Sequence, residues 1–166
     1  MSQARKLMLI ALLACAGASA QIIDENPDWR ESDVPPAPVF DVKRLIRLES
    51  PPGSSLIFGV DPATLSITPE GIVRYVVVAS SPGGAQNVMY EGIRCTTAQH
   101  RVYARYNAQS GWSQVLDGEW KPLFGSPATR HALTFARAGA CSGRAASQSP
   151  GDIVRALNAV RPPGYD

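Results

Sequence analysis

Residues 72–79 constrain the fold of this 166-residue chain more than any other stretch. Four of the eight residues are valine, and from Tyr75 onward both alternating faces of the stretch are apolar. β-Branched residues favour a strand, and a strand that is apolar on both faces is typical of the centre of a sheet. The sequence therefore predicts a central strand here that is buried on both sides.

Further strand-like stretches lie on either side, separated by turns rich in proline, glycine and serine. We expect strands at residues 43–49, 56–60, 64–68, 87–95, 100–106 and 112–116. Because side chains alternate along a strand, residues 87–95 divide between two faces. One face carries Val88, Tyr90, Gly92 and Arg94, and the other carries Met89, Glu91, Ile93 and Cys95. In residues 100–106, the same rule separates Val102, Ala104 and Tyr106 from Arg101, Tyr103 and Arg105.

The C-terminal part of the chain changes from strand to helix periodicity. Ser126 followed by proline predicts the start of a helix that extends to about residue 137, and Ser149 followed by proline predicts a second helix, to residue 161. In the second helix, apolar residues recur at helical spacing and form one stripe. Strands first and helices last predict an α+β fold, an antiparallel meander of about five to six strands with C-terminal helices packed on one face.

The N-terminus is typical of a secretory signal peptide. Arg5 and Lys6 precede an apolar run, and small residues lead to a cleavage site after Ala20. The apolar run is too short to span a bilayer, so we expect export to the periplasm without a transmembrane span. A lipid anchor at Cys15 is the alternative, because residues 12–15 resemble a lipobox.

The remaining chain is expected to divide into three parts. Residues 21–41 are acidic and proline-rich, which predicts an extended arm, and its Trp29 is expected to dock on the domain surface. Residues 42–161 form the predicted single domain, and residues 162–166 form a tail. Without residues 1–20, acidic and basic residues are equal in number. The basic residues form no cluster, so we do not expect the protein to bind nucleic acid.

Two cysteines remain after signal cleavage, Cys95 and Cys141. An oxidising compartment favours a disulfide between them, with two buried thiols or a redox pair as alternatives. A redox pair usually has closer spacing, as in C-x-x-C.

Several motifs in residues 71–104 resemble the CNP-one-like (CNP1-like) family of small secreted bacterial proteins of unknown function. The most specific is Tyr-Glu-Gly-Ile-Arg-Cys at residues 90–95, and the others lie at residues 71–75, 84–88 and 103–104. The likeness extends over about residues 29–141 and includes Trp29, Trp112, Trp120 and Cys141. It implies export and a domain of this length, but it brings no catalytic activity.

Glu91 is the most interesting charged residue, since it lies within a strand-like stretch. With Arg74 and Arg94 on strands expected to be neighbours, it forms either a substrate site or a cross-strand ion pair. Regular alternation puts Glu91 and Arg94 on opposite faces, so we expect Glu91 to face Arg74 or Arg101.

Other chemistry has weaker support in the sequence. His100 and His131 are the only histidines, too few for a typical zinc site unless an acidic residue or a cysteine joins them. No serine-hydrolase elbow and no phosphate-binding loop is present, so we predict no catalytic residue, no metal and no cofactor.

The aromatic residues suggest a binding surface instead. Groove-lining candidates are Tyr75, Tyr90, Tyr103, Tyr106, Trp112 and Trp120, although aromatics on adjacent strands also form core pairs. We therefore expect a non-enzymatic binding or envelope-associated accessory module, with an envelope protein or a glycan as its partner. An envelope hydrolase that uses Glu91 with His100 is the alternative.

Overall fold

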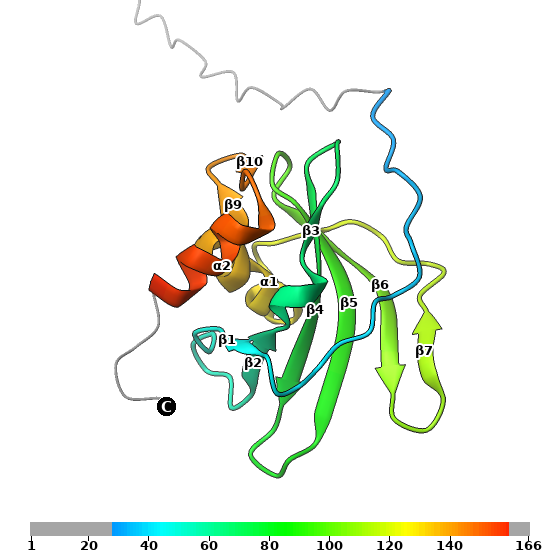
Figure 1. The fold of residues 1–166 in the computed structure, drawn as a ribbon, viewed down its shortest axis with the longest axis vertical. Helices are drawn as coiled ribbons and strands as arrows, with labels where there is room; N and C mark the ends of the chain where they lie inside the picture. The colour runs from blue at the N-terminus through cyan, green and yellow to red at the C-terminus, as the bar shows by residue number, and fades with distance from the viewer. Residues whose placement is uncertain (1–27, 160–166) are drawn as a thin grey trace, which may run out of the picture.

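An antiparallel β-sheet with helices on one face forms the body of the protein (Figure 1). The structure, a computed structural model, describes residues 28–159. The predicted signal peptide with its cleavage site, the alternative lipid anchor at Cys15 and the predicted tail lie outside the described residues. Among the helices that are described, none is long and apolar enough to cross a membrane.

The sheet is a meander, as the sequence predicts, with three long strands at its centre. These are β4 (Ile72–Ser80), β5 (Gln86–Arg94) and β6 (Gln99–Asn107). The order along the sheet is β1-β2-β4-β5-β6-β7, with β3 also paired to β4 and β8 to β6. The shorter strands are β1 (Ile46–Arg47), β2 (Ile57–Val60), β3 (Ser66–Ile67), β7 (Gly111–Gln114) and β8 (Lys121–Pro122).

Strand β4 lies inside the sheet and is buried on both faces, which confirms the prediction made from its valines. Every residue from Ile72 to Ala79 is buried. Its odd-numbered residues pack toward the helices, and Val76 and Val78 pack into a second apolar cluster on the opposite, outer face. The predicted strand at residues 43–49 is much shorter than expected, because only β1 pairs with β2.

Helices α1 (Arg130–Phe135) and α2 (Pro150–Ala159) cover the other face of the sheet. Ser126 accepts a hydrogen bond from the N–H of Ala128, and Ser149 from that of Asp152, as expected of the predicted caps. The first helix is less regular than predicted. A short 3-10 turn (Pro127–Thr129) precedes α1, and a π-helical turn (Ala136–Ala140) follows it.

The π-helical turn lets α2 approach closely. Gly139 has a φ of 135°, and a Cβ at this position would lie 2.5 Å from the Cβ of Ala156. Only glycine combines this backbone conformation with so little space. The turn leads into a small hairpin of β9 (Cys141–Ser142) and β10 (Ala145–Ala146).

The Cys95–Cys141 disulfide predicted from the sequence joins the end of β5 to the start of β9. It links the sheet to the segment between α1 and α2, and Cys95 is buried in the core. The cross-link therefore holds the helical layer against the sheet.

The N-terminal arm crosses the outer face of the sheet before entering β1, opposite the helices (Figure 1). Ala37 and Phe40 of the arm pack against the cluster formed by Val76, Val78 and Tyr90. This contact covers part of the face that would otherwise expose the apolar residues of β4.

Candidate functional site

A buried carboxylate on β5 lies at the centre of the candidate site. Glu91 is completely buried and points toward the helical layer, on the same face as Met89 and Ile93. The sequence alternation had placed these residues together, and that assignment is confirmed. A carboxylate on an apolar face must find polar partners, because an isolated buried charge is very costly.

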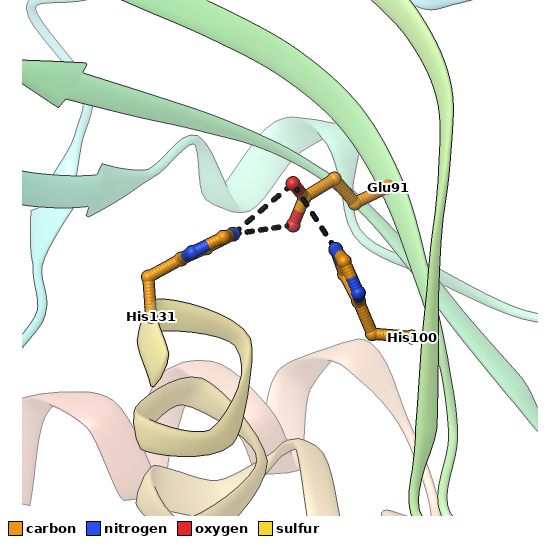
Figure 2. A group of neighbouring side chains, drawn as sticks. All are labelled: Glu91, His100 and His131. Carbon is orange, nitrogen blue, oxygen red and sulfur yellow. Dashed lines mark hydrogen bonds and ion pairs between the residues drawn. The ribbon is translucent and has the colours of Figure 1, made fainter. Parts of the chain in front are cut away.

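Two imidazoles meet this carboxylate from different elements (Figure 2). His131, on α1, lies with Nε2 2.9 Å from Oε2 and 3.1 Å from Oε1 of Glu91. His100, on β6, lies with Nε2 3.5 Å from Oε1. Both histidines are buried, so the chain places all of its imidazoles against one carboxylate.

Core packing fixes the positions of these groups. The ring of His131 stacks on Phe58 of β2, with centroids 5.2 Å apart and planes 6° apart. Tyr75 of β4, directly opposite Glu91 in the sheet, donates its hydroxyl hydrogen to Oε2 at 2.8 Å. Tyr75 in turn packs against Phe135 of α1, so the sheet and the helix position the cluster together.

The cluster has the electrostatics of a buried ion pair. Burial raises the pKa of Glu91, but the charges of His131 and the nearby His100 outweigh it and hold that pKa well below its usual value. Burial lowers the pKa of His131, and the carboxylate of Glu91 more than compensates, so the pKa is raised. Burial, with Glu91 next to the hydroxyl, raises the pKa of Tyr75 well above its usual value.

The expected pairing of Glu91 with Arg74 or Arg101 is wrong. Arg74 lies directly opposite Gly92, one position along from Glu91, and points to the outer face. Glu91 itself lies opposite Tyr75 on one side and Val102 on the other. Because side chains alternate along a strand, Arg74 and Glu91 point to opposite faces of the sheet. The partners of Glu91 are therefore histidines from β6 and α1 and not arginines.

The arginines instead bind the N-terminal arm on the outer face. Glu31 accepts hydrogen bonds from Tyr103 at 2.6 Å, Arg101 at 3.0 Å and Arg74 at 3.3 Å. Arg74 also donates to the carbonyl oxygens of Ser32 and Asp33. This carboxylate site is therefore filled by the chain's own arm.

Trp29 docks beside this network, as expected from the sequence. The guanidinium of Arg94 lies over its ring, 3.6 Å from the centroid, and Trp120 meets it edge to face. Tyr103 also contacts Trp120 edge to face. Gly92 makes room for Tyr103, because a Cβ there would lie 2.3 Å from the tyrosine oxygen.

A β-bulge explains why the alternation predicted for residues 100–106 is wrong. The register with β5 shifts between Tyr90, which pairs with Ala104, and Glu91, which pairs with Val102. Tyr103 is thus the extra residue and shares the outer face with Ala104. As a result, His100 and Val102 point to the helices, beside Glu91, while Tyr103 points to the arm.

The predicted aromatic candidates fall into three places. Tyr75 belongs to the buried cluster, whereas Tyr90 and Tyr103 are buried against each other on the outer face. Trp112 and Tyr106 lie farther along that face with Phe40, each of the three in edge contact with the other two.

A groove of about 510 Å³ opens beside this last group. Its side chains are apolar, aromatic or amide-bearing: Phe40, Val42, Gln86, Val88, Tyr106, Asn107, Ala108 and Gln109. Of these, only Tyr106 is among the groove candidates expected from the sequence, because Phe40 comes from the arm and the amides come from strand ends. None of the lining residues is charged.

The buried cluster can store a proton or hold a metal ion, since Glu91, His100 and His131 each offer a ligand atom and these atoms lie within 4.8 Å of one another. Two histidines alone are too few for a typical zinc site, and Glu91 is the acidic residue that joins them. The position of His131 could have been inferred from its spacing to Phe135, which predicts that both share the buried side of α1.

Comparison with known proteins gives one match. The sequence profile of the CNP1-like family matches residues 24–158, which is most of the chain and agrees with the resemblance noted in its motifs. No curated protein and no solved structure matches the chain.

Proposed function

The chain belongs to the CNP1-like family, and we propose that it is an exported binding module of the cell envelope that recognises a glycan in the outer-face groove. The observation that carries the proposal is the composition of this groove, in which aromatic rings lie beside side-chain amides. Rings provide apolar contact area, and amides donate and accept hydrogen bonds, so together they suit a ligand that is both hydroxylated and partly apolar.

The lack of charge in the groove narrows the ligand class. A site for an acidic peptide or a phosphate would be expected to present arginine or lysine. Among the residues that line this groove there is no charged side chain. A neutral sugar, and one with acetamido groups in particular, matches the three amides of Gln86, Asn107 and Gln109.

Tryptophan fluorescence provides the test, because Trp112 contacts both Phe40 and Tyr106. Titration with tri-N-acetylglucosamine is expected to change the emission, and Tyr106→Ala is expected to abolish the response. Phe124→Ala is the matched control, since Phe124 is an exposed aromatic residue outside the groove. An unchanged emission for the wild type, or an equal response of Tyr106→Ala, would contradict the proposal.

Export is the second part of the proposed function. Residues 1–20 support it, because a basic start, an apolar run and small residues before the cleavage position are typical of a signal peptide. Mass spectrometry of protein from a periplasmic extract is expected to find an N-terminus at Gln21. Labelled palmitate on Cys15 would instead show a lipoprotein.

One observation favours the alternative, an envelope hydrolase: Glu91 and His100 lie 3.5 Å apart. However, Glu91 is completely buried, and a general base must reach its substrate. The binding module needs no such opening, because its groove already faces solvent. We therefore prefer the binding function.

A further inference from the structure

We propose that Glu91, His100 and His131 together bind one divalent transition-metal ion, such as zinc. This inference is independent of the groove and of the binding function assigned to it. It starts from the chemistry of the three side chains. Two imidazoles and one carboxylate form a donor set that zinc uses in proteins, whereas calcium and magnesium prefer oxygen atoms alone.

The three ligand atoms lie within 4.8 Å of one another, so the side chains need to draw together around such an ion. Ligand atoms around a tetrahedral zinc ion, each about 2.0–2.1 Å from the metal, lie roughly 3.3–3.5 Å from one another. His100 Nε2 and Glu91 Oε1 are 3.5 Å apart. His131 Nε2 is closer to the carboxylate, 2.9 Å from Oε2, so the ion would replace this hydrogen bond and separate the two groups slightly.

The state of His100 points independently to a ligand. His100 is 5% exposed, and within the described part of the chain its Nδ1 has no hydrogen-bond partner, while the only polar contact of its Nε2 is the 3.5 Å ion pair with Glu91. Buried polar groups without partners are rare and costly. Figure 2 shows the ring directed at the carboxylate of Glu91, although the separation is too long for a good hydrogen bond. A metal ion bound between the two would satisfy Nε2.

The surroundings also suit a metal centre. Tyr75 donates a hydrogen bond to Glu91 Oε2 and so orients the carboxylate. Residues that do not bind the metal themselves commonly orient its ligands in this way. Phe58 stacks on His131 and fixes its ring. The ligands come from β5, β6 and α1, so a bound ion would tie the first helix to the middle of the sheet.

The test uses the full-length exported protein without a histidine tag, so that its two histidines are the only imidazoles. Because the cluster is closed to solvent, we expect the ion to enter as the chain folds. The protein is therefore refolded from urea, with the disulfide intact, in the presence of cobalt(II) or zinc(II). One equivalent of cobalt is expected to give visible absorption bands, and zinc is expected to raise the melting temperature by several degrees.

Variants identify the ligands. His100→Gln is the main variant, because His100 makes only a long 3.5 Å contact with Glu91, whereas His131 makes shorter hydrogen bonds to that carboxylate. We expect it to weaken metal binding at least about tenfold. Glu70→Gln is the matched control, since Glu70 lies outside the cluster and accepts hydrogen bonds from the arm residue Ser32, and this variant should bind metal as the wild type does.

A measurement on the wild type alone completes the test. With both histidines labelled with ¹⁵N, zinc is expected to shift the Nε2 signals of both rings. The proposal is overturned if the wild type takes up no cobalt or zinc at 100-fold molar excess, if His100→Gln binds as tightly as the wild type, or if neither Nε2 signal moves.

Discussion

The carboxylate of Glu31 holds the N-terminal arm on the sheet by accepting hydrogen bonds from Arg74, Arg101 and Tyr103. Glu31→Gln tests how much these contacts stabilise the protein. The substitution keeps the size of the side chain and removes its charge. It leaves Arg74, whose side chain is 5% exposed, without its carboxylate partner, although two carbonyl oxygens still accept from it. Arg101 is 28% exposed and can turn to water.

The size of the effect follows from these exposures. Breaking a fully buried ion pair costs about 3–5 kcal/mol, whereas an exposed pair contributes at most about 1 kcal/mol. Glu31 is 10% exposed and also loses a charge-assisted bond from Tyr103, so we expect a loss of about 2–3 kcal/mol. With a typical urea dependence of about 2 kcal/mol per molar, the unfolding midpoint should fall by roughly 1–1.5 M.

Urea unfolding followed by circular dichroism measures this midpoint. Limited trypsin digestion adds a local readout, because Arg30 lies next to Glu31 and should be cleaved faster when the arm detaches. Glu70→Gln is the control, since Glu70 binds Ser32 of the same arm at an exposed position and should cost less than about 1 kcal/mol. A Glu31→Gln midpoint equal to that of the wild type, with unchanged cleavage, would refute the reasoning.

Three further predictions concern the core. Cys141→Ser should destabilise the protein by about 2–5 kcal/mol relative to the oxidised wild type, measured by urea unfolding without reductant; equal stability of oxidised wild type and variant would contradict this. Burial opposes ionisation of Asp61, but Arg44 and backbone N–H groups outweigh this effect and lower the pKa of the carboxyl group. The ionised carboxylate therefore stabilises the folded protein, and this contribution should be lost as the pH falls below about 4. Asp61→Asn should flatten that part of the curve of unfolding free energy against pH. Glu91→Gln should lower the melting temperature by about 10 °C or more, because His131 loses its buried counterion; an unchanged melting temperature would show that the pair does not stabilise the fold.

The long elements of this fold can be predicted from the sequence because their patterns are strong. Four valines mark β4, and the alternation in β5 assigns its residues to the correct faces. The serine–proline pairs mark the starts of both helical segments. The short strands β8, β9 and β10 and the π-helical turn have no such pattern, because a two-residue strand is defined by its partner rather than by its own sequence.

The candidate site is harder to predict, because it depends on contacts between distant segments. The alternation of residues 87–95 predicts the face of Glu91 correctly, but it does not predict the partners of its carboxylate. A bulge at Tyr103 puts His100 on the helical face, and packing of α1 brings in His131. A carboxylate between Met89 and Ile93 on an apolar face does signal a buried partner, but alternation alone cannot identify it.

Nuclear magnetic resonance tests most directly whether the outer-face groove binds a glycan. The protein, labelled with ¹⁵N, is titrated with tri-N-acetylglucosamine, and the backbone amide signals are followed. We expect the largest shifts at Phe40, Val88, Tyr106 and Asn107, with the indole signal of Trp112 moving alongside them. Shifts that concentrate on the helical face, or no shift at millimolar sugar, would contradict it.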